Sequence, residues 1–92
     1  MTVTVQIGNS DDKLPQRGWA GFVNETAEAI KRHVQDIHFA GGSPASAPWQ
    51  NYAWVVECAP DQLDFLKRHV RAVRTKYGQA SAAFTEGQTQ FI

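Results

Sequence analysis

The sequence predicts an α+β fold of the ferredoxin-like type, in which two helices cover one face of an antiparallel sheet. Two observations lead to this prediction. Segments that alternate like strands and segments with helical spacing of apolar residues follow one another in the order βαββαβ. Two right-handed crossovers then place both helices on the same face of the sheet. With 92 residues the chain has the length of a single domain, residues 1–92.

The first strand and the first helix are predicted in the N-terminal third. Val3, Val5 and Ile7 alternate with polar residues, which is typical of a strand with one buried face. A dense turn signal follows at residues 8–12, where Asp12 is a candidate helix cap. A helix is expected over residues 15–34. Its apolar stripe is Trp19, Phe22, Val23, Thr26, Ile30 and Val34.

Two further strands are predicted in the middle of the chain, on either side of the loop at residues 41–48. In the second strand, Ile37 and Phe39 alternate with polar residues and are expected on one face. The third strand, residues 51–58, is apolar on both faces, as central strands usually are. One face is expected to carry Tyr52, Trp54, Val56 and Cys58, and the other face Ala53 and Val55. Because two helices cover only one face of the sheet, some apolar area is expected to remain exposed.

The second helix is the clearest prediction, over residues 62–77, with Asp61 as its cap and Gly78 at its end. Its apolar stripe is Leu63, Leu66, Val70, Val73 and Tyr77. A fourth strand is predicted over residues 80–85. A tight turn at residues 86–87 is expected to lead into a short fifth strand, residues 88–92.

Composition and charge narrow the classes of partner. Nine Lys and Arg balance nine Asp and Glu, so the basic surplus of a general nucleic-acid binder is missing. No apolar run approaches the length of a membrane span, about 18 residues. The single cysteine, Cys58, has no partner within the chain, which fits a reducing cytoplasm. We therefore predict a cytoplasmic protein that binds neither nucleic acid nor membrane.

Nine residues are candidate ligand contacts, and they come from three segments. The turn after the first strand offers Asn9, Asp11 and Asp12, and the segment before the third strand offers Trp49, Gln50 and Asn51. The open sheet face offers Gln6, His38 and Glu57. The paired aspartates could hold Mg²⁺, although a solvated turn is the favoured interpretation. An imidazole beside a carboxylate could bind a polar ligand, although a solvent-facing cross-strand pair is favoured.

No set of residues indicates catalysis. The three histidines lack the spacing of a metal site, and Cys58 has no obvious histidine partner. A Gly-rich phosphate loop is also missing from the sequence. We therefore predict no enzyme activity, no metal and no cofactor.

Two further patterns have competing interpretations. Residues 51–56 resemble the third-strand motif of RNA-recognition domains, but Gln6 replaces their first-strand aromatic residue, so Tyr52 and Trp54 are expected in the core. The second helix carries a basic band that could contact an anionic partner or form a solvated face. The band comprises Lys67, Arg68, Arg71 and Arg74.

Three strings in the sequence, with Trp19, resemble small uncharacterised proteins of actinobacterial phages and their hosts. The strings are IGNSDDKL at residues 7–14, APWQN at residues 47–51 and TEGQTQFI at residues 85–92. The resemblance covers most of the chain and brings no established activity. It implies an intracellular setting and favours small binding or interfering proteins over enzymes.

These observations predict a non-enzymatic binding protein that forms a homodimer. The first hypothesis is that it sequesters a nucleotide-like small molecule in a groove between protomers. The alternative hypothesis is an effector that binds and modulates one host protein through an exposed aromatic surface.

Overall fold

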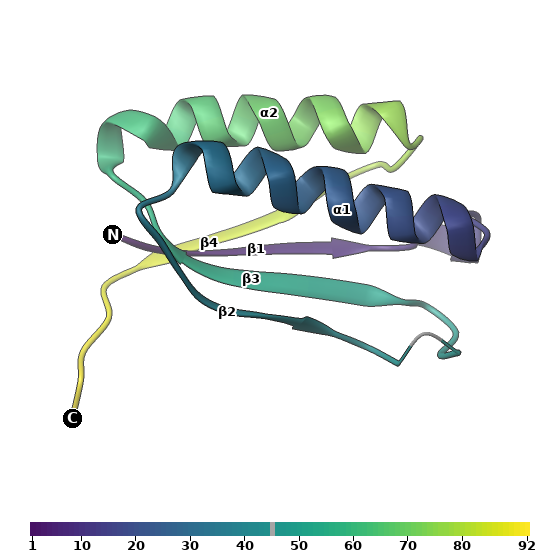
Figure 1. Ribbon diagram of the computed structural model, residues 1–92, viewed down its shortest axis with the longest axis horizontal. Coiled ribbons are helices and arrows are strands. Elements are labelled where there is room, and N and C mark those ends of the chain that lie inside the picture. The colour runs from purple at the N-terminus through teal and green to yellow at the C-terminus, as the bar shows by residue number, and fades with distance from the viewer. Residues whose placement is uncertain (45) are drawn as a thin grey trace.

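The computed structural model describes residues 1–44 and 46–92 and has the predicted ferredoxin-like arrangement (Figure 1). Its elements are β1 (Thr2–Gly8), α1 (Gln16–His33), β2 (Asp36–Gly42), β3 (Asn51–Glu57), α2 (Leu63–Lys76) and β4 (Ala83–Gly87). A short 3-10 turn precedes each helix, at Ser10–Asp12 and at Pro60–Gln62. The four strands are antiparallel in the order β2-β3-β1-β4, and both helices lie on one face of the sheet (Figure 1).

The core lies between the central strands and the two helices. Val3, Val5 and Ile7 of β1 face the helices and are buried, as their alternation predicts. The buried set of β3 is Trp54 and Val56, continued by Cys58, so the other face of β3 is the open one. The predicted helical stripes are largely buried as well. The buried members are Trp19, Phe22, Thr26 and Ile30 in α1 and Leu66, Val70 and Val73 in α2.

A close approach between the helices explains a glycine in the middle of α1. Glycine weakens a helix interior by about 1 kcal/mol relative to alanine. A Cβ at Gly21 would lie 2.7 Å from Tyr77 Oη, and the Tyr77 ring stacks on Phe22 with centroids 5.4 Å apart. Gly21 therefore gives the tyrosine room to pack across α1.

The C-terminal strand differs from the prediction. β4 begins at Ala83 and runs through Gly87, because Glu86 and Gly87 pair in register with Val3 and Thr2 of β1. The expected turn at residues 86–87 and the fifth strand at residues 88–92 are therefore wrong. Those last five residues follow β4 without strand structure and extend away from the sheet (Figure 1).

The predicted cap of the second helix is also wrong. Asp61 lies inside the 3-10 turn Pro60–Gln62, and no side chain caps α2. The turn satisfies backbone donors by itself, because the N–H groups of Gln62 and Leu63 donate to the carbonyls of Ala59 and Pro60. A tight backbone turn thus replaces the side-chain cap.

A β-bulge in β2 changes which side chains reach the open face. The register shifts between Ile37, which pairs with Val56, and Phe39, which pairs with Val55. Val56 is buried under the helices, whereas Val55 lies on the opposite face. Phe39 is therefore on the open face and 57% exposed, and the prediction that it shares a face with Ile37 is wrong.

Among the described residues no helix lies on the second face of the sheet (Figure 1). Neither α1 nor α2 is long and apolar enough to cross a membrane.

Candidate functional site

The structure divides the nine predicted ligand contacts between two ends of the sheet. His38 and Glu57 lie beside the first residue of β1, and Gln6 is exposed on the open face. The other six lie around or beyond the last residue of β1: Asn9, Asp11, Asp12, Trp49, Gln50 and Asn51. A seven-residue strand spans about 20 Å at about 3.3 Å per residue. One small molecule therefore cannot contact both groups.

Asn9 is a structural residue rather than an exposed ligand contact, because it is only 2% exposed. Its Oδ1 accepts a hydrogen bond from Leu14 N, and its Nδ2 donates to Leu14 O, each at 2.9 Å. The Asn9 amide thus closes the turn between β1 and α1. Both ends of its side chain are engaged inside the protein, which gives Asn9 a structural role, and its ligand contact stays a prediction.

Gln50 belongs to the same buried amide cluster, at 4% exposure. Its Nε2 donates to Gln16 Oε1 at 2.7 Å, and its backbone carbonyl accepts from Asn9 N at 2.8 Å. Gln79 is 2% exposed and accepts from Ser10 N at 2.9 Å. Three distant segments thus meet here, and the ligand contact of Gln50 likewise stays a prediction. Sequence reasoning missed Gln79, whose only signal is its place after Gly78.

Asp11 and Asp12 are exposed in the 3-10 turn, with left-handed φ angles of 55° and 52°. Aspartate tolerates this backbone region better than most residues, which supports a turn. Helix α1 follows Pro15 without a side-chain cap, so the suggestion that Asp12 caps it is wrong. In residues 1–44 and 46–92, no three His, Cys, Asp or Glu side chains gather in a metal-binding arrangement.

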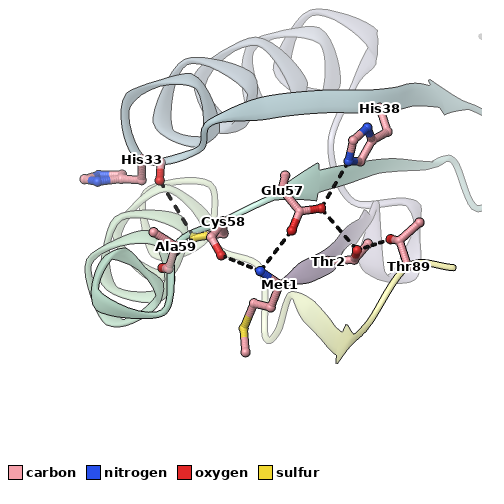
Figure 2. Close-up of polar contacts among 8 residues, drawn as sticks. All are labelled: Met1, Thr2, His33, His38, Glu57, Cys58, Ala59 and Thr89. Carbon is pink, nitrogen blue, oxygen red and sulfur yellow. Dashed lines mark hydrogen bonds and ion pairs between the residues drawn. The ribbon is translucent and has the colours of Figure 1, made fainter.

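A polar cluster joins the strands at the opposite end of the sheet, where β1 begins (Figure 2). Glu57 Oε1 accepts from His38 Nε2 and from Thr2 Oγ1, each at 3.2 Å, and Glu57 Oε2 lies 2.9 Å from the Met1 amine. The hydroxyls of Thr2 and Thr89 contact each other. The predicted proximity of His38 and Glu57 is therefore confirmed, and the cluster also joins β1 to the C-terminal tail.

The partners of Glu57 decide its chemical role. The hydrogen bond from the Met1 amine, followed by the one from His38, lowers the pKa of Glu57. Both carboxylate oxygens are occupied by protein donors. Glu57 is therefore better suited to holding the ends of β1 and β2 together than to accepting a proton. Beside it lies a hollow of about 630 Å³, a volume typical of small-molecule sites. The hollow is lined by Met1, Thr2, Glu57, Pro60, Gln88, Thr89 and Phe91.

Cys58 is a buried structural thiol. Its Sγ lies 3.7 Å from His33 O (Figure 2), and burial raises the pKa of the thiol. A protonated, buried thiol is a weak nucleophile, which agrees with the structural interpretation of this residue.

An ion-pair cluster between the helices predicts how stability depends on pH. Glu25 Oε1 accepts from Lys76 Nζ at 2.8 Å, and Tyr77 Oη donates to the other carboxylate oxygen. These bonds, that of Lys76 first, lower the pKa of Glu25 in the folded protein. Its stabilisation is thus present above the unfolded pKa, about 4.3, and is lost as the pH falls through the folded pKa.

We expect urea unfolding between neutral pH and about pH 3 to show a shallower loss of stability in Glu25→Gln than in the wild type. Glu28→Gln is the matched control, since Glu28 is exposed and, among the described residues, forms one ion pair, with Lys31 at 3.5 Å. Equal pH slopes for Glu25→Gln and the wild type would contradict the prediction.

Comparison with known proteins supports the fold alone. No family model matches the chain, and no curated protein matches it significantly. Among solved structures, the chain is similar to a dimeric ferredoxin-like protein of unknown function from Thermobifida fusca, with a TM-score of 0.61 and 8% sequence identity. The match covers 91% of this chain and 86% of that chain. The similarity confirms the ferredoxin-like fold predicted from the sequence.

Proposed function

We propose that this protein is a homodimeric, non-enzymatic binding protein of the cytoplasm. Two copies join through the uncovered sheet face, and a small polar molecule of nucleotide size binds at the end of that interface. The carrying observation is the open face itself, where Phe39 is 57% exposed and no described helix covers it. The dimeric state of the Thermobifida fusca protein, which shares the fold, supports the proposal.

The distribution of charge on the open face supports face-to-face packing. The strand registers put only uncharged side chains in the two middle rows of this face: Thr4, Val55, Phe39 and Thr85, and Gln6, Ala53, Gly41 and Ala83. The charged side chains Asp36 and Glu57 gather at one end, beside His38. Interfaces commonly have an uncharged centre and a polar rim. Small and β-branched residues also let a second sheet pack at about 10 Å.

The proposed small molecule would bind in the hollow at the charged end of the sheet. The hollow adjoins Thr2 and Glu57, and the C-terminal tail forms one wall through Thr89 and Phe91. The hydroxyls of Thr2 and Thr89 and the Phe91 ring suit a molecule with polar groups and a flat apolar part. A second copy packed on the sheet would cover this hollow and enlarge the site.

Sedimentation velocity with Phe39→Asp tests the dimer. At about tens of micromolar we expect the wild type at twice the 10.2 kDa chain mass. Phe39→Asp should raise the dissociation constant by at least about a hundredfold, because it places a charge within the uncharged rows of the interface. Phe65→Asp on α2 is the matched control, since Phe65 is 50% exposed but lies away from the open face. A monomeric wild type, or equal effects of the two variants, would contradict the dimer.

Native mass spectrometry of the freshly purified protein tests the ligand. The expected spectrum shows the dimer with a small-molecule adduct that denaturing conditions release. A dimer at twice the chain mass, without an adduct, would support the assembly and contradict the ligand.

The effector hypothesis remains a second candidate because of Trp49. This tryptophan is 63% exposed and has a left-handed φ of 57°, a conformation that costs about 1–3 kcal/mol and is concentrated at functional sites. We propose that, in this case, Trp49 contacts the partner protein. A stoichiometric partner that is lost with Trp49→Ala and kept with Phe39→Asp would favour the effector over the small-molecule binder.

A further inference from the structure

A second hollow, of about 260 Å³, lies between α2 and the segment that leads into β4. Lys67, Arg71 and Arg74 line one side of it, and their spacing of four and three residues places them on one face of the helix. Val70, Ala82 and Phe84 add apolar surface. The hollow therefore combines a basic rim with an apolar floor.

The positive charge of this groove is only partly neutralised. Lys67 pairs with Glu86 at 2.8 Å. Arg74 donates one Nη1 hydrogen bond to Gln79 O at 3.1 Å, which leaves other guanidinium donors available. Within residues 1–44 and 46–92, no carboxylate forms an ion pair with Arg71 or Arg74. A chain of zero net charge thus concentrates two unneutralised guanidinium groups at one groove.

The structure also divides the predicted basic band. Arg68 lies outside the hollow, with its guanidinium 5.3 Å from the centroid of the Phe65 ring. Arg71 and Arg74 instead border Phe84 and Ala82, which are partly buried against the core. Arg68 and Arg71 are both exposed on α2 but have different surroundings. Arg68 therefore offers a control of the same charge.

We propose that this groove binds a small phosphate-bearing molecule. Guanidinium groups bind phosphate oxygens in pairs, with planar geometry and strong charge-assisted hydrogen bonds. The phosphate contacts Arg71 and Arg74, and the apolar or ring part of the molecule packs on Phe84 and Ala82. The site lies on the helix side of the sheet, so it does not depend on the proposed dimer or on the hollow beside Glu57.

Titration of ¹⁵N-labelled protein with phenyl phosphate at constant ionic strength, followed by NMR, tests the site. We expect shifts confined to the amides around residues 67–74 and 80–84. Phenyl phosphate should bind more tightly than inorganic phosphate, because only the former reaches the apolar floor. Arg71→Gln should weaken phenyl phosphate binding about tenfold, which corresponds to about 1.4 kcal/mol, and Arg68→Gln should leave it unchanged.

Three results would overturn the proposal. One is the lack of saturable shifts in the groove at millimolar phenyl phosphate. Another is an equal loss in Arg68→Gln and Arg71→Gln, which would indicate general surface charge. The third is equal affinity for the two phosphates, which would remove the role of the apolar floor. Titration of the monomeric Phe39→Asp variant separates this site from the dimer, since binding there is expected to persist.

Discussion

Asn9→Ala is expected to lower the free energy of unfolding by about 3 kcal/mol. The Asn9 side chain pairs with both backbone groups of Leu14 at 2.9 Å, inside a turn where Asn9 is 2% exposed. Alanine would leave a backbone donor and a backbone acceptor without these bonds, and each costs about 1–3 kcal/mol when buried. Because Asn9 also contacts Gln50, the loss would spread to the loop before β3.

Urea unfolding at neutral pH measures this effect. Asn24→Ala makes the same chemical change on the exposed side of α1, and we expect it to alter stability by no more than about 0.5 kcal/mol. If Asn9→Ala kept wild-type stability but lost a bound molecule, the structural role would be wrong and Asn9 would be a ligand contact.

Trp54→Ala is expected to cost about 4 kcal/mol, within the range for truncating a large core aromatic residue. Trp54 is 2% exposed in β3, a central strand. The centroid of its ring lies 4.8 Å from the centroid of the Tyr52 ring. Alanine would leave a cavity under the helices that the neighbouring side chains fill only in part.

Trp49→Ala provides the comparison, since Trp49 is 63% exposed and its loss should change stability by no more than about 0.5 kcal/mol. Thermal unfolding followed by far-UV circular dichroism distinguishes the two variants. Equal melting temperatures would contradict the core position of Trp54. A buried Trp54 also cannot stack on a base from the open face, so it does not serve as the strand aromatic of an RNA-recognition domain.

The fold was predictable because its signals are local. The alternation of Val3, Val5 and Ile7 and the stripe that includes Phe22 and Ile30 each identify one element and its buried face. The number and order of elements then leave few topologies. Element ends were less predictable, because backbone pairing extended β4 through Gly87 and a 3-10 turn displaced Asp61 from its capping role.

The candidate site was less predictable because burial in loops depends on distant segments. Asn9 and Gln50 have the polarity and loop position of ligand contacts, yet they are buried where the chain around Gln79 packs against them. No local pattern records that meeting. The His38 and Glu57 pair was predictable, since neighbouring antiparallel strands bring residues near a shared end together.

The bulge in β2 also affects how the protein can assemble. Strands β2 and β4 are the two edges of the sheet, and a regular edge can pair with an edge of another copy and continue without limit. The extra residue at His38 interrupts the regular spacing of backbone groups along β2. It thus disfavours open-ended strand addition at that edge while it turns Phe39 outward on the face. One inserted residue therefore makes this edge of the sheet a poor template for a growing fibre.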